Sequence, residues 1–316
     1  MKIRQLFLPR PLRVLFKKGR RAGVHARSVA MTLRLRAGFP RWVAAHLARR
    51  GLRGRVVVAK QGVLGVLTPG EYLRFTQGPK ARARLLEEVE NWSRMAEAGF
   101  ADIIPRFMQL QDLPEGLVLA TEPLLPIARE GHVGTMLPLV RRLATAATPL
   151  MHHGLPETVE EGLRFASEAG AARDESFISE DELRAAFARP LLTGLSHQDL
   201  HWRNVLQRNG EPVLVDLKKC EPGRLLCLDI LNMACLSLAA RTGGNVVSQA
   251  SAAQRRGWDD AELAPVLALV DLPRRAWGPA YFLHVAGLYR LRRQGKSGWG
   301  EEVLFRRVME QDWRPA

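Results

Sequence analysis

The chain has 316 residues, of which 47% are hydrophobic and 25% are charged, a balance that supports a folded core and excludes a disordered chain. Its three cysteines, Cys220, Cys227 and Cys235, form no CxxC pair, so neither a disulfide framework nor a zinc site is indicated. Because the sequence contains no apolar run long enough for a membrane span or a secretory signal, we expect a cytoplasmic protein.

The formal net charge of +15 comes from the N-terminal region. Seventeen Lys and Arg residues precede Glu71, the first acidic residue, so the rest of the chain is close to neutral. Leu, Phe and Trp are interleaved with these cations, a composition typical of segments that bind anionic membrane surfaces. We therefore predict that residues 1–54 form a basic extension that holds the protein at the inner face of the cytoplasmic membrane. A solvated face, a targeting segment and the less favoured nucleic-acid contact are the alternatives.

In chain order, helices are predicted around residues 27–36 and from Pro40 to Arg50, the second on the helical spacing of its apolar residues. Short strands at 55–59, 63–67 and 71–76 follow, then a helix from about Lys80 to Ala98, then strands at 104–108 and 117–120. The remainder is predicted to be mostly helical, with helices at 134–151, within 157–189, and at 229–242, 259–270, 273–293 and 299–312. The acidic residues between 156 and 185 could line an acceptor pocket.

The strongest motif lies between Ser196 and Leu206. It reads H-x-D-L-x-x-x-N, the pattern of a kinase catalytic loop, with His197, Asp199 and Asn204 at its polar positions. Two apolar runs joined by an Asn-Gly turn follow and predict a β-hairpin that brings Asn204 and Asp216 to one place. Their oxygen atoms suit Mg²⁺, and Asp199 could accept a proton from an attacking hydroxyl. An ordinary surface loop is the alternative, and the agreement of spacing and residue types disfavours it.

On these residues the chain resembles the aminoglycoside phosphotransferase and choline kinase group of small-molecule kinases. The resemblance implies an α+β, bilobal protein-kinase-like fold, with a small antiparallel-sheet N-lobe at 55–124 and a larger, mostly helical C-lobe at 125–316.

The same resemblance implies roles for individual residues of the motif. Asp199 would be the catalytic base, Asn204 and Asp216 the magnesium ligands, and His197 the residue that orders the loop. Asp229 would be structural and bond backbone near the loop. Position 201 is His where protein kinases usually have Lys, so His201 either contacts phosphate or substrate or simply packs, and the sequence favours neither alternative.

Kinases of this fold place a cation on the third strand and pair it with a glutamate on the next helix, against the ATP phosphates. Strand order and spacing favour Arg74 with Glu88. The string from Val57 to Lys60 resembles the V-A-I-K element, so Lys60 is the alternative cation. The pair Thr121-Glu122 resembles the adenine-contacting segment of bacterial lipopolysaccharide core kinases, which implies that Glu122 lies near the base.

The sequence therefore predicts an enzyme, an ATP- and Mg²⁺-dependent kinase that phosphorylates a hydroxyl of a non-protein acceptor. The basic N-terminus favours a sugar of a cell-envelope glycan or lipopolysaccharide as the acceptor. The alternatives are a soluble kinase of the aminoglycoside or choline type and a pseudokinase scaffold, the last because Arg74 stands where the family has Lys and the two are not equivalent.

Overall fold

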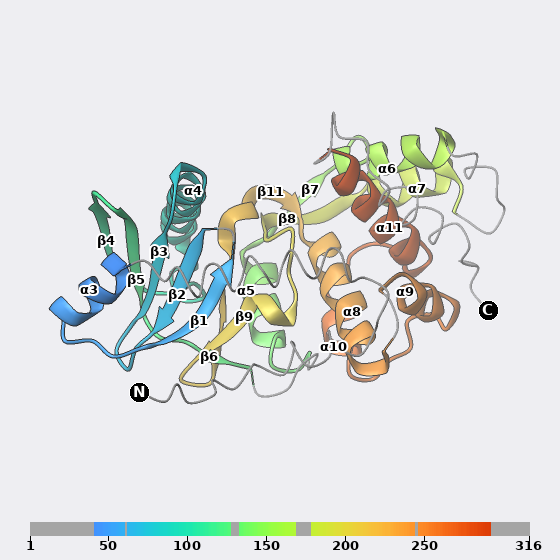
Figure 1. Cartoon of the computed structure of the whole chain (residues 1–316). Helices are drawn as coiled ribbons and strands as arrows, with labels where there is room; N and C mark the ends of the chain where they lie inside the picture. The colour runs from blue at the N-terminus through green and yellow to red at the C-terminus, as the bar shows by residue number, and fades with distance from the viewer. Residues whose placement is uncertain (1–40, 61, 128–132, 169–177, 244–245, 292–316) are drawn as a thin grey trace, which may run out of the picture. The chain divides into compact units, whose positions relative to one another are not determined.

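The computed structural model describes residues 41–60, 62–127, 133–168, 178–243 and 246–291, which fall into two compact units (Figure 1). The first unit holds the described residues up to Leu86 together with Arg106–Pro123. The second holds Glu87–Pro105 and the described residues from Leu124 onward. The helices predicted near 27–36 and 299–312 lie outside the described residues.

The first unit is built on a five-stranded antiparallel sheet with the strand order β1-β2-β3-β5-β4 (Figure 1). Its strands are β1 (Arg55–Lys60), β2 (Val63–Leu67), β3 (Tyr72–Thr76), β4 (Phe107–Leu113) and β5 (Gly116–Thr121). Gly62 turns the chain between β1 and β2 with φ of 81°, and a Cβ there would lie 2.7 Å from the Gln77 carbonyl oxygen. The turn therefore requires glycine.

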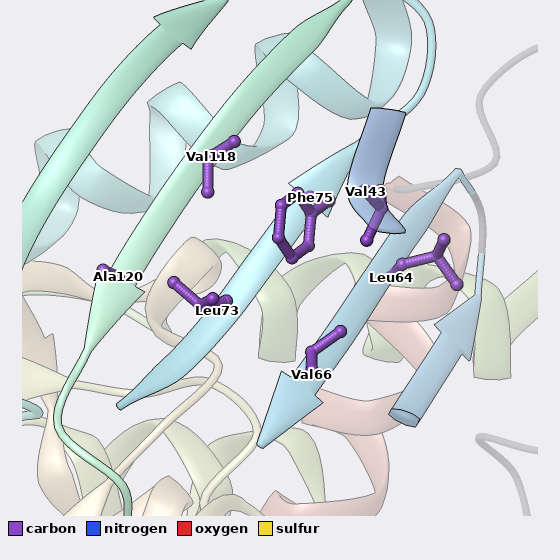
Figure 2. Close-up of a cluster of buried hydrophobic side chains, with 7 residues drawn as sticks. All are labelled: Val43, Leu64, Val66, Leu73, Phe75, Val118 and Ala120. Atoms are coloured by element: carbon purple, nitrogen blue, oxygen red, sulfur yellow. The ribbon is translucent and has the colours of Figure 1, made fainter. Parts of the chain in front are cut away.

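Helix α3 (Arg41–Arg49) covers one face of this sheet. Figure 2 shows Val43 pointing toward apolar side chains that alternate along β2, β3 and β5, namely Leu64, Val66, Leu73, Phe75, Val118 and Ala120. Full burial of each larger member contributes roughly 1.5–3 kcal/mol relative to exposure. The rings of Trp42 and His46 meet Phe75 edge-on, with centroids 5.3 Å and 5.6 Å away. Helix α3, which falls within the predicted basic extension, thus packs onto the core of the first unit through its apolar side.

Helix α4 (Pro79–Met95) runs from the first unit into the second and ends in a π turn at Ala96–Phe100. The strand predicted at 104–108 is displaced and starts at Phe107. The displacement has a physical reason in the second unit, where the Ile103 carbonyl accepts a hydrogen bond from the Leu214 N–H at 2.7 Å. The Ile104 carbonyl likewise accepts from the Arg208 guanidinium at 2.6 Å.

The second unit contains two three-stranded sheets. One has the order β10-β9-β6, from β6 (Leu125–Pro126), β9 (Val205–Arg208) and β10 (Glu211–Leu214). The other has the order β11-β8-β7, from β7 (Thr148–Met151), β8 (Pro190–Ser196) and β11 (Glu221–Leu225). The hairpin predicted from the Asn-Gly turn is therefore present as β9 and β10.

Seven helices are described in the second unit after α4. They are α5 (Leu137–Ala146), α6 (Glu157–Glu168), α7 (Glu180–Phe187), α8 (Leu226–Thr242), α9 (Val246–Arg255), α10 (Ala264–Leu267) and α11 (Arg274–Leu291). Eleven residues of α8 are buried, which places this helix in the core of the unit. No helix in the described ranges is both long enough and apolar enough to cross a membrane.

Two of the predicted helices are wrong in extent. The helix expected at 134–151 stops at Ala146, because Thr148 to Met151 pair with β8 and the residue before Pro149 is biased away from helical geometry. The helix expected at 259–270 is reduced to α10. The Asp260 carboxylate accepts the N–H groups of Glu262 and Leu263, which is the pattern of a helix N-cap, so helical structure begins after Asp260 and not at Asp259.

Candidate active site

The loop between β8 and β9 carries the kinase-like motif, and Asp229 holds its first residues. Asp229 lies buried in the first turn of α8, and its Oδ2 accepts the His197 N–H at 2.6 Å. Burial raises the pKa of Asp229 to about 6, while hydrogen bonds from the Ser196 side chain and the His197 and Gln198 amides act in the opposite direction. Gln198 has a φ of 56°, in the left-handed region that non-glycine residues rarely adopt. The structural role predicted for Asp229 is confirmed.

The His197 side chain joins the loop to the residue that follows β10. It is buried, and its Nε2 lies 2.9 Å from the Val215 carbonyl oxygen. A carbonyl only accepts, so Nε2 carries the proton in this bond. Burial lowers the pKa of His197, which keeps the ring neutral at physiological pH. Within the described residues its Nδ1 has no hydrogen-bond partner.

Asn204 and Asp216 lie at the two ends of the β9–β10 hairpin. The Asn204 carbonyl accepts the Val215 N–H at 2.8 Å, and its side-chain nitrogen donates to the Asp199 carbonyl at 3.0 Å. The hairpin thus brings the start of β9 beside Asp216, whose φ of 63° is left-handed.

The chemistry of this pair fits a magnesium ion. Asp216 offers a carboxylate, and the hydrogen bond from Asn204 to Asp199 uses the amide nitrogen rather than the amide oxygen. Carboxylate and amide oxygens are hard donors of the kind that Mg²⁺ takes one or two at a time, with water and phosphate completing its shell. In the part of the chain that the structure describes, no group of three or more His, Cys, Asp or Glu side chains forms a denser metal site.

The side chain of Asp199 is 37% exposed and has a cation against it. Lys219 Nζ donates to Asp199 Oδ2 at 3.0 Å, and His201 Nε2 lies 3.6 Å from Oδ1. Partial burial by itself would raise the pKa of Asp199, but the hydrogen bond and charge of Lys219 outweigh it and lower the pKa. Asp199 is therefore an ionised acceptor at neutral pH.

His201 faces Asp199 as a neutral ring. Its Nδ1 accepts the Arg203 N–H at 3.1 Å, so the ring proton lies on Nε2, the atom nearer Asp199. Burial lowers the pKa of His201, more than the neighbouring Asp199 raises it. The 3.6 Å separation is longer than a hydrogen bond, so His201 does not fix the carboxylate, and its contact with phosphate or substrate stays a prediction.

Lys219 was not selected from the sequence. It ends the short helical turn Leu217–Lys219 and stands just before β11, which pairs with β8 through Glu221 and Ser196. This pairing brings the segment before β11 to the end of β8, where the loop begins and where the Lys219 side chain bonds Asp199. The only sequence signal was a lysine three residues after Asp216, and its meaning depends on a strand pairing that the sequence does not reveal.

Two further residues support the loop and were also missed. The Leu200 carbonyl accepts from Asn232 Nδ2 at 3.1 Å, and Asn232 Oδ1 accepts from the Tyr281 hydroxyl at 3.1 Å. Burial raises the pKa of Tyr281 well above its ordinary value, so the hydroxyl remains a donor. Asn232 and Tyr281 come from α8 and α11, and nothing in their spacing from the motif pointed to this contact.

The residues predicted to bind nucleotide lie in both units. Arg74 is on the central strand β3 and Lys60 ends the edge strand β1, which agrees with the strand order that favoured Arg74. Arg74 alternates with Leu73 and Phe75, so it faces away from the apolar cluster under α3. Glu88 is a buried residue of α4 in the second unit. The pairing of Arg74 with Glu88 stays a prediction.

Glu122, expected near adenine, closes the end of the β4–β5 ladder. Its carboxylate accepts the Arg106 N–H at 2.7 Å, and its own N–H donates to the Arg106 carbonyl at 3.2 Å. These two groups are therefore engaged within the first unit, and the nucleotide contact of Glu122 stays a prediction.

No family model matches the sequence, and no curated protein matches it. Among solved structures, the chain is similar to the choline kinase LicA of Streptococcus pneumoniae, at 12% identity and a TM-score of 0.47, over 86% of this chain and 98% of that one. A choline/ethanolamine kinase family protein of Mesorhizobium loti matches at 16% identity and a TM-score of 0.46, over 90% and 95%.

A third similar structure is an aminoglycoside phosphotransferase in a ternary complex with ADP and hygromycin B. It matches at 13% identity and a TM-score of 0.46, over 84% of this chain and 97% of that one. The structure itself has an antiparallel sheet in one unit and mostly helices in the other. Identities and scores in this range assign neither a family nor an activity.

Proposed function

We propose that the chain is an ATP- and Mg²⁺-dependent phosphotransferase that moves the γ-phosphoryl group of ATP to a hydroxyl of a non-protein acceptor. The observation that carries the proposal is the arrangement around Asp199. An ionised, partly exposed carboxylate lies on a loop whose backbone is tied through Asn204 to the residue before Asp216. This one set of hydrogen bonds supports the assignment of Asp199 as the base and of Asn204 and Asp216 as the metal ligands.

In the proposed reaction Asp199 accepts a hydrogen bond from the acceptor hydroxyl and aligns its oxygen with the γ-phosphorus. A bond forms between that oxygen and phosphorus, the bond to the β–γ bridging oxygen breaks, and ADP leaves as the hydroxyl proton passes to Asp199. Asn204 and Asp216 would hold magnesium, which neutralises charge on the phosphates when bound. Asp229 and His197 keep the loop in place, so catalysis consists mainly of positioning and charge stabilisation.

For nucleotide binding we propose that Arg74, paired with Glu88, holds the ATP phosphates, and Lys60 is the alternative cation. The Thr121-Glu122 segment and its adenine contact belong to the same proposal. The alternative is a catalytically inactive scaffold, and a measurement of Mg-ATP binding distinguishes it from a kinase.

For the acceptor we propose a sugar of a cell-envelope glycan or lipopolysaccharide. A soluble cationic amine would be favoured by a pocket of unpaired acids, which the sequence suggested near 156–185. Most described acids of α6 and α7 instead pair with arginines: Glu160 and Glu180 with Arg184, Glu161 with Arg164 and Arg290, Glu168 with Arg290, and Glu182 with Arg275. Paired acids offer little attraction to a cation, so a neutral or anionic acceptor suits this region better.

Nucleotide binding tests the proposal before any acceptor is known. We expect saturating Mg-ATP to raise the unfolding temperature of the full chain by roughly 5 °C, because a ligand that binds only the folded state stabilises it. Omitting magnesium, or the substitution Asp216→Ala, should remove most of this shift. Asp259→Ala, which removes an exposed carboxylate of the second unit, should behave as wild type.

Turnover provides the second measurement, with water as the acceptor and release of γ-phosphate from Mg-ATP as the signal. Asp199→Asn should lower this rate by about 10²–10⁴-fold, the range for loss of a positioned acid or base, while the Mg-ATP-dependent thermal shift remains. Absence of a thermal shift in wild type would reject the kinase proposal in favour of a scaffold. A shift with unchanged turnover in Asp199→Asn would reject Asp199 as the base.

A further inference from the structure

Lys219 has a defined position within the candidate site. Its ammonium group donates to Asp199 Oδ2 at 3.0 Å, and among the described residues this is its only hydrogen bond. An ammonium group has three donors, so two remain for another partner on the partly exposed side of the Lys219 side chain.

The turn that carries Lys219 is anchored on both sides. Leu217 is fully buried, and its carbonyl accepts from Asn91 Nδ2 at 3.2 Å and from the Cys220 N–H at 3.1 Å. Two residues after Lys219, Glu221 pairs with Ser196 at the end of β8. Because its flanking backbone is held in this way, the lysine is directed at the catalytic loop rather than free to extend into solvent.

The catalytic loop itself supplies no other cation beside Asp199. The Nδ1 atom of His201 accepts the Arg203 N–H, as a neutral ring does, and the Arg203 guanidinium stacks over the Trp202 ring, 4.8 Å from its centroid. A carboxylate that must lie close to a phosphoryl group repels it, since both are negative, and in a partly buried site such repulsion is weakly screened. The described site therefore contains one ammonium group in position to relieve that repulsion.

We propose that Lys219 is a further catalytic residue, whose ammonium group bridges Asp199 and the γ-phosphoryl group during transfer. The inference rests on the proposed function. In this role Lys219 donates one hydrogen bond to Asp199 and another to a γ-phosphoryl oxygen, and its charge stabilises the negative charge on the transferring group. Lys219 belongs to the segment after Asp216, so its ammonium group reaches Asp199 from outside the loop between β8 and β9.

The inference predicts a contact with the γ-phosphate that ADP cannot make. The test compares the affinities of the full chain for Mg-AMP-PNP and Mg-ADP by calorimetry, in wild type, Lys219→Met and Lys219→Arg. We expect Lys219→Met to weaken AMP-PNP binding by about tenfold or more and ADP binding by less than about twofold. Hydrolytic turnover should fall by about 10²–10³-fold, the range for loss of one charge-stabilising donor. Lys219→Arg keeps the charge and should retain most of the preference for AMP-PNP.

Arg224→Met is the matched control. It removes a cation five residues beyond Lys219 that forms an exposed ion pair with Glu221, so both affinities and the turnover should stay at wild-type values. If Lys219→Met does not fold, as judged by its thermal melt, Lys219→Gln takes its place in the same comparison.

The outcomes separate the two proposals. If wild type binds neither nucleotide, the proposed function itself fails. If wild type binds both and hydrolyses ATP, but the neutral variant keeps the preference for AMP-PNP and the turnover, Lys219 has no contact with the γ-phosphate and the inference is wrong. Equal weakening of AMP-PNP and ADP would also contradict it, since that result reports a general effect of charge on the site.

Discussion

At the level of single residues, the pKa values of two carboxyl groups are shifted in opposite directions: Asp199 lies on the loop between β8 and β9, and Asp229 lies in α8 and holds that loop. Asp229 is fully buried, and burial raises its pKa to about 6 despite the amide donors around it. Asp199 is partly exposed, and Lys219 lowers its pKa against the effect of partial burial. The first carboxyl group holds backbone, whereas the second is an ionised acceptor for which we propose the role of catalytic base, so the same residue type has different environments for the two roles.

The pKa of Asp229 predicts a pH-dependent stability. Because the folded-state value of about 6 lies above the ordinary 3.8, the contribution of this group to folding is present below about pH 4 and lost as the pH rises through about 6. The loss is on the order of 3 kcal/mol. Urea unfolding of wild type and Asp229→Asn across this range should show wild type losing stability relative to the variant, since asparagine does not titrate.

Asp259→Asn, at an exposed aspartate of the second unit, is the control and should leave the pH dependence unchanged. A constant difference in unfolding free energy between wild type and Asp229→Asn at every pH would contradict the raised pKa. The amide variant also loses one acceptor for the His197 and Gln198 amides, which adds a pH-independent destabilisation that the comparison of slopes removes.

At the scale of elements, α6 and α11 pack through facing glycines. A Cβ at Gly162 would collide with the Leu283 carbonyl, and one at Gly287 would collide with the Thr158 carbonyl and lie 2.9 Å from the Gly162 nitrogen. The two helices therefore touch through their backbones at these positions. Tyr281, on the same helix α11, supports the loop that carries Asp199 through Asn232, so this packing helps to position the loop.

We expect Gly287→Ala to destabilise the second unit by roughly 1–3 kcal/mol, because a methyl group there forces the two helices apart. Gly154→Ala is the matched control, since a Cβ at Gly154 has no atom within 4 Å and the position needs no left-handed backbone. Chemical unfolding measures the effect. Equal stability of the two variants would show that α6 and α11 are not in backbone contact at Gly287.

For the molecule as a whole, most of the positive charge of the predicted extension, residues 1–54, precedes helix α3. Eleven of the seventeen cations before Glu71 lie within residues 1–40. Residues 41–49 form α3, which buries Val43 in the sheet of the first unit. A truncation that tests the membrane contact must therefore stop before Arg41, because removing α3 would expose the apolar cluster in Figure 2.

We expect the full chain to sediment with phosphatidylglycerol vesicles but not with phosphatidylcholine vesicles, and to release as salt is raised, since attraction to an anionic surface is screened. A chain beginning at Arg41 should lose this binding and keep its thermal melt. Unchanged binding of the truncated chain would place the contact elsewhere, and no binding by either chain would reject the membrane prediction.

The sequence by itself determined the parts whose partners lie close together along the chain. The motif from His197 to Asn204 and the hairpin up to Asp216 form one local unit, so residue types and spacing were enough to predict it. Tertiary structure decided the contacts between distant segments. The bond from Lys219 to Asp199 joins the segment before β11 to the loop after β8, Tyr281 reaches that loop through Asn232, and Thr148 to Met151 form a strand because β8 offers a partner. Such contacts depend on how elements pack rather than on periodicity within them, which is why helical spacing predicted 134–151 wrongly and gave no sign of Lys219.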